Sequence, residues 1–73
     1  MYTDEQIADL ALAAAGGDHK QAAAQLRLKA SEFRELASAL SNIDNARVRL
    51  SSAVGKRERA ADLVDELSRP AVT

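Results

Sequence analysis

Cysteine and tryptophan are absent from this 73-residue chain, and proline, phenylalanine and tyrosine each occur once. Without cysteine there is no disulfide framework, no cysteine-bound zinc and no thiol nucleophile, so burial of apolar surface must hold the chain together. Hydrophobic residues make up 47% of the chain, but 16 of them are alanine. One core in a chain below about 70–80 residues rarely supplies more than about 3–5 kcal/mol. The composition predicts one small domain over residues 1–73 that is stabilised by oligomerisation.

Long hydrophobic runs are also missing. The longest uninterrupted apolar segment covers residues 10–15, far less than the roughly 18 residues that indicate a membrane span. Carboxylates near the N-terminus stand where a secretory signal would carry positive charge. We therefore expect a cytoplasmic protein that has no contact with a membrane.

Residues suited to catalysis are equally sparse. His19 is the only histidine, so neither a histidine pair for a metal nor a Ser/His/Asp arrangement is available. The densest group of carboxylates, Asp62, Asp65 and Glu66, has no glycine-rich phosphate loop beside it. We expect no enzymatic activity, no metal site and no cofactor.

The first segment, residues 4–17, is predicted to be a helix. Thr3 is a favourable N-cap, and Gln6 three residues later completes a capping-box pattern. Apolar residues follow at helical spacing. Gly16 and Gly17 are expected to end the helix, because glycine readily adopts the left-handed backbone conformation.

Residues 18–40 are predicted to form two helices joined by a short turn. Asp18 can cap the first helix, whose apolar side consists of Ala22, Ala23 and Leu26. The triplet 27–29 interrupts the apolar spacing, which then resumes with Phe33, Leu36, Ala37 and Leu40. Two helices joined by about three residues have the spacing of a helix-turn-helix.

This stretch resembles the DNA-binding helix-turn-helix of the Fis type, which also occurs at the C-terminus of NtrC-like activators. Gly17-Asp18, the pair Ala22-Ala23 and Phe33 match the family pattern, and the resemblance covers residues 8–40. The family has glycine at the turn where this chain has Arg27. The resemblance implies contacts to double-stranded DNA from His19, Lys20, Arg27, Lys29, Ala30, Ser31 and Arg34.

Residues 41–68 are predicted to be C-terminal helices. A break near residues 41–42 precedes a helix from about 43 to 54, Gly55 ends it, and a further helix covers 56–68. Apolar residues at alternating spacings of three and four also permit one long helix. We favour a helical hairpin that forms a dimer surface from Ile43, Leu50, Val54, Val64 and Leu67. The tail 69–73 is expected to be frayed.

Charge is unevenly distributed along the chain. Residues 1–18 hold four carboxylates and no Lys or Arg, whereas residues 38–61 hold five Lys or Arg against two carboxylates. This basic cluster consists of Arg47, Arg49, Lys56, Arg57 and Arg59. Beside a helix-turn-helix it would contact phosphates, and we assign that role first to Arg47 and Arg49.

Together these features predict an all-α domain of four to five helices that regulates transcription as a DNA-binding homodimer. The alternative is an acidic helical protein-binding adaptor or inhibitor, of the phage or mobile-element type, that does not bind DNA. Glu32 and Glu35 on the predicted recognition helix favour the alternative, since phosphates repel carboxylates. So does the isoelectric point of about 5.7, because nucleic-acid-binding domains commonly have values above about 9.

Overall fold

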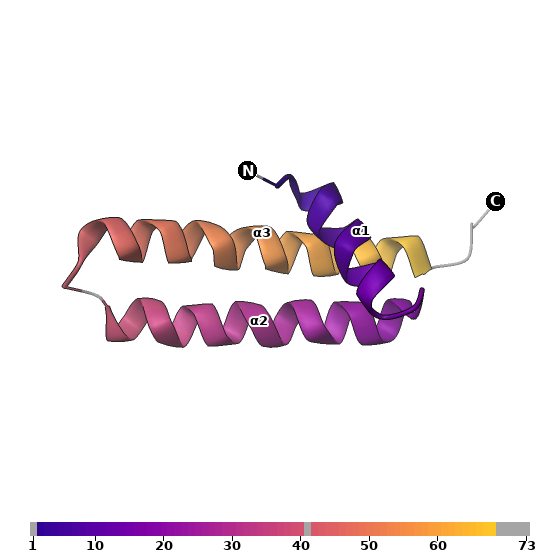
Figure 1. Cartoon of the computed structure of the whole chain (residues 1–73), viewed down its shortest axis with the longest axis horizontal. Coiled ribbons are helices and arrows are strands. Elements are labelled where there is room, and N and C mark those ends of the chain that lie inside the picture. Colours follow the sequence, from indigo (N-terminus) through magenta and orange to yellow (C-terminus); the bar gives the residue numbers. More distant parts are fainter. Residues whose placement is uncertain (1, 41, 69–73) are drawn as a thin grey trace.

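The structure is a computed structural model that describes residues 2–40 and 42–68. It contains α1 (Asp4–Ala14), α2 (His19–Ala39) and α3 (Asp44–Ser68). The helices α2 and α3 form a long antiparallel hairpin, and α1 lies across the end where α2 begins and α3 ends (Figure 1). The molecule extends over 49 × 19 × 19 Å. The all-α class is confirmed, but the described residues form three helices rather than four or five. The tail 69–73 lies outside the described residues.

Both ends of α1 follow local sequence rules. The Thr3 hydroxyl accepts a hydrogen bond from the Gln6 backbone N–H at 3.2 Å, and the Gln6 side chain accepts one from the Thr3 N–H at 2.9 Å. This confirms the predicted capping box. Gly16 and Gly17 have φ values of +65° and +88°, and the Gly17 N–H donates to the Leu12 carbonyl at 2.8 Å. The glycine turn is confirmed, although the helix ends at Ala14 rather than at residue 17.

The helix-turn-helix prediction for residues 18–40 is wrong, because α2 is continuous from His19 to Ala39. Asp18 caps it as predicted, accepting from the Gln21 N–H at 3.1 Å. The triplet 27–29 contains neither glycine nor proline, and Arg, Leu and Lys are all good helix formers. The apolar side of α2 continues through this triplet, because Ala30 is buried four residues after Leu26. Leu28 lies off that side and is 52% exposed.

The prediction of two helices within residues 41–68 is also wrong, since Gly55 lies inside the continuous helix α3. A glycine inside a helix costs about 1 kcal/mol relative to alanine, which tertiary packing can offset. The partner in the hairpin is α2, not a second C-terminal helix. The alternative of one long helix is therefore the arrangement present.

The core is small and rich in alanine. Its main cluster comprises Ala8, Ala22, Ala23, Leu26, Ala60, Ala61 and Val64. Alanine brings helix axes close together but buries little apolar area per residue. Val64 is the largest side chain that is fully buried. The core thus allows three helices to pack closely while contributing modest stability.

This core also corrects the predicted dimer surface. Val64 and Val54 are buried within the chain, at 0% and 7% exposure, so neither can contact a second copy. Leu50 is half-buried. Only Ile43 and Leu67, at 50% and 63% exposure, remain accessible.

None of the three helices in residues 2–40 and 42–68 combines the length and hydropathy needed to span a bilayer.

The backbone conformations of Gly55 and Gly16 predict opposite outcomes for two substitutions by alanine. Gly55→Ala should raise the free energy of unfolding by roughly 0.5–1 kcal/mol, because the new methyl group would meet only the movable end of the Arg59 side chain. Gly16→Ala should lower it by about 1–2 kcal/mol, because alanine is strained at positive φ. Urea unfolding followed by circular dichroism measures both. A destabilising Gly55→Ala would contradict this expectation.

Candidate protein interface

Ion pairs join α2 to α3 along one side of the hairpin. Arg27 of α2 donates to Asp62 at 3.4 Å and to Asp65, both on α3. Two turns further along α2, Arg34 donates to Glu58. The hydrogen bond with Asp65 raises the pKa of Arg27 above its ordinary value. Because these side chains are largely exposed, each pair contributes at most about 1 kcal/mol and chiefly sets the register of the two helices.

Another side of the hairpin is covered by α1, but only over part of its length. Ala8 belongs to the same core cluster as Ala60 and Val64 of α3, and Ile7 packs against that cluster. The Asp4 carboxylate accepts a hydrogen bond from Arg59 Nε at 2.9 Å. An 11-residue helix spans about 16 Å, whereas the 25 residues of α3 span about 37 Å. The hairpin therefore continues well beyond the part that α1 covers (Figure 1).

A groove lies where α1 stops covering α3. It has a volume of about 630 Å³ and lies between the N-terminal end of α1 and the first half of α3. Two of its lining side chains, Tyr2 and Val48, are large, apolar and exposed by 62% and 63%. Its lining consists of Tyr2, Ile7, Val48, Arg49, Ser52, Ala53, Lys56 and Arg57. We call this site the open groove.

Three cationic side chains line the open groove. Lys56 Nζ donates to the Tyr2 backbone carbonyl at 3.3 Å. The Arg57 guanidinium lies 4.5 Å from the centre of the Phe33 ring and donates to the Ala53 carbonyl at 3.2 Å. Arg49 is exposed. Within residues 2–40 and 42–68, no carboxylate forms a salt bridge with Arg49, Lys56 or Arg57. The groove therefore combines apolar lining with uncompensated positive charge.

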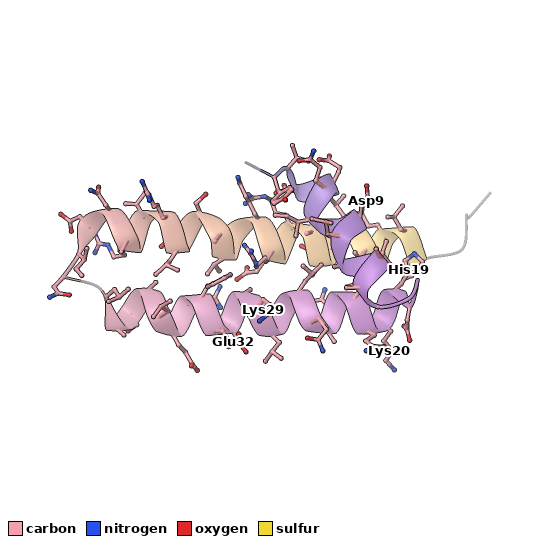
Figure 2. The ribbon with its side chains drawn as sticks, viewed as in Figure 1. Asp9, His19, Lys20, Lys29 and Glu32 are labelled. Atoms are coloured by element: carbon pink, nitrogen blue, oxygen red, sulfur yellow. The ribbon has the colours of Figure 1, made fainter. Side chains whose placement is uncertain are left out.

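Only some of the residues predicted to contact DNA come together, in a groove between α2 and α3 that is lined by Arg27, Ala30, Ser31, Arg34, Glu58 and Asp62. His19 and Lys20 lie at the beginning of α2, whereas Lys29 lies farther along the helix beside Glu32 (Figure 2), with which it pairs at 3.6 Å. Ala30 is buried and Ser31 is exposed. The arginines at 27 and 34 are engaged with α3, as described above.

The two predicted phosphate-contacting arginines of α3 differ in their surroundings. Arg47 approaches Asp44 within 3.9 Å, at the start of the helix. Arg49 lines the open groove. The structure thus brings Arg49, but not Arg47, together with Lys56 and Arg57 of the basic cluster.

Sequence reasoning missed the apolar part of the groove. Tyr2, Ile7 and Val48 were not among the predicted site residues, because their proximity depends on how α1 crosses α3. One signal was present in the sequence: Arg57 occupies an otherwise apolar position in the three–four spacing of residues 43–67. A cation among apolar positions indicates that this side of the helix is only partly buried. In the structure the Arg57 guanidinium packs on the Phe33 ring.

Comparison with known proteins finds no matching family model, no similar curated protein and no similar solved structure. Among the described residues, no three His, Asp or Glu side chains gather in a way that could hold a metal ion.

The exposed ion pairs predict small and salt-dependent effects on stability. Arg27→Ala and Arg34→Ala should each lower the free energy of unfolding by less than about 1 kcal/mol. Since salt screens exposed charges, the loss should shrink further near 1 M NaCl, where the screening length is about 3 Å. Lys20→Ala, which removes a cation without a salt bridge to a described residue, is the matched control. A loss above about 2 kcal/mol that persists in high salt would contradict this assignment.

Proposed function

We propose that this chain is a small helical protein-binding adaptor that holds a helix of its partner in the open groove. The observation that carries the proposal is the incomplete cover of the hairpin. Exposed apolar side chains, Tyr2 and Val48, remain beside the half-buried Ala53 at the place where α1 stops. Contiguous exposed apolar surface with a polar rim is typical of protein-interaction sites.

A helix is the occupant that suits this shape. The helix α1 already packs against α3 through Ile7 and Ala8, so the hairpin accepts a third helix along less than half of the length of α3. On α3, Ala53 precedes Ala60 by seven residues, or about two turns, and so lies on the same side of the helix. A second helix laid beyond α1 would extend the layer that α1 begins, in the helix-in-groove mode of recognition.

The DNA-binding hypothesis has less to support it in this arrangement. The unbroken α2 offers no short recognition helix held out by a turn. Arg27 and Arg34, two of the cations assigned to DNA, are paired with carboxylates of α3. Contact between DNA and the remaining cations, Lys20 and Arg49 among them, stays a prediction that a titration can test.

A second copy of the chain is also a poor fit to the open groove. Pairing two such grooves face to face would bring Arg49, Lys56 and Arg57 of each copy together, and like charges at close range repel. The expected homodimer stays a prediction, but the groove itself favours a different protein.

The proposal is tested by nuclear magnetic resonance on the ¹⁵N-labelled chain. The ligands are a random-sequence DNA duplex and three helical peptides of about 15 residues, a length at which helices become stable in water. The peptides share a Leu/Ala apolar face and carry Glu, Gln or Lys on the polar face. We expect at least one peptide to shift the amide signals of Ser52 and Ala53, and the duplex to shift none.

The matched variants locate the binding site. Val48→Ser removes an exposed apolar side chain from the groove, and Leu28→Ser removes one, 52% exposed, from α2. Val48→Ser should weaken peptide binding at least threefold, while Leu28→Ser should leave it unchanged. The absence of a response to any of the three peptides would overturn the proposal, as would equal losses of peptide binding in both variants.

A further inference from the structure

We infer that the partner helix is acidic: an amphipathic helix whose carboxylates contact Arg49 and Lys56 while its apolar edge lies against Val48 and Ala53. This inference rests on the proposed function and adds the chemical class of the partner. Three observations on the groove support it, concerning its charge, its ordered arginine and the way α1 already binds α3.

The first observation is the charge of the groove. Arg49, Lys56 and Arg57 all line it, and no carboxylate within residues 2–40 and 42–68 forms a salt bridge with any of them. Every other described arginine, and Lys29, has a carboxylate partner. Positive charge that the chain leaves uncompensated is therefore concentrated where apolar surface is also exposed. Complementary charge on a partner gives specificity and accelerates association.

The second observation is that one of these cations is held in place. Arg57 lies over the Phe33 ring and donates to the Ala53 carbonyl. Arg57 thus holds its positive charge at a fixed place in the groove, where it adds to the attraction that Arg49 and Lys56 exert on an acidic helix.

The third observation comes from α1, which shows how a helix binds to this side of α3. The carboxylate of Asp4, in the first turn of α1, pairs with Arg59 of α3, while Ile7 packs on the core cluster. Thus an acidic first turn and an apolar edge already form one interface with α3. Lys56 and Arg49 lie about one and three turns before Arg59 on α3. They could pair with the carboxylates of a partner helix as Arg59 pairs with Asp4.

The affinities of the three peptides test the inference. The Glu peptide should bind at least tenfold more tightly than the Gln peptide, and the Lys peptide should bind most weakly. The advantage of the Glu peptide should diminish as salt rises, because salt screens exposed charges. Fluorescence anisotropy of labelled peptides, at two salt concentrations, gives these ratios.

Charge reversal provides the sharper test. In the double variant Arg49→Glu with Lys56→Glu, the order should invert, so that the Lys peptide binds more tightly than the Glu peptide. Lys20→Glu, at the beginning of α2 and outside the lining of the open groove, should keep the wild-type order of peptide affinities. Arg57 is left unchanged because its contact with Phe33 stabilises the hairpin. Circular dichroism checks that each variant is folded, and Arg49→Gln alone provides a milder charge change if the double variant unfolds.

Failure of the inference and failure of the proposed function have different signatures. If the Gln or Lys peptide binds the groove as tightly as the Glu peptide, the acidic partner is excluded and the protein-binding function stands. If none of the peptides binds, both are overturned. A chain that light scattering shows to be dimeric, with the signals of Ser52 and Ala53 shifting on dilution, would mean that a second copy occupies the groove, which also excludes the inference.

Discussion

The difference in length between α1 and the other two helices is the constraint on which the rest of the structure depends. Eleven residues of α1 face a hairpin whose arms have 21 and 25 residues, so a three-helix core exists only at one end. That end contains the main buried cluster, including Ala22, Ala60 and Val64. The remainder of the hairpin is a pair of helices with one long side uncovered. Both the small core and the open groove follow from this mismatch.

The alanine-rich core allows the three helices to pack closely although α1 is much shorter than α2 and α3. Helices in contact through Ala23, Ala61 and their neighbours approach closely, and cross-helix ion pairs set their register without adding much stability. In the part of the hairpin that α1 does not cover, the Arg57 guanidinium lies over the Phe33 ring. The uncovered half of the hairpin is thus partly shielded by its own cations. The same cations give a partner helix charged groups to contact, and this links the packing to the proposed function.

The sequence predicted the features that depend on neighbouring residues. The Thr3 capping box, the Asp18 cap and the glycine turn are confirmed, because each is decided within one turn of helix. The helix-turn-helix was wrong because the apolar spacing across residues 27–29 reports which side chains are buried, not where the backbone bends. The open groove was not predictable, since it depends on the path of α1 across α3, between residues more than 40 positions apart.

The most direct test of this account is the length of α2. The chain has no cysteine, so Lys20→Cys and Ser38→Cys would provide unique positions for two spin labels on exposed residues. Eighteen residues of uninterrupted helix separate the two α-carbons by about 27 Å, and five full turns place both labels on the same side. Pulsed electron paramagnetic resonance should give a single narrow distance distribution near that value. A distribution centred well below about 20 Å would mean that α2 bends near Leu28, restoring the helix-turn-helix and contradicting the hairpin.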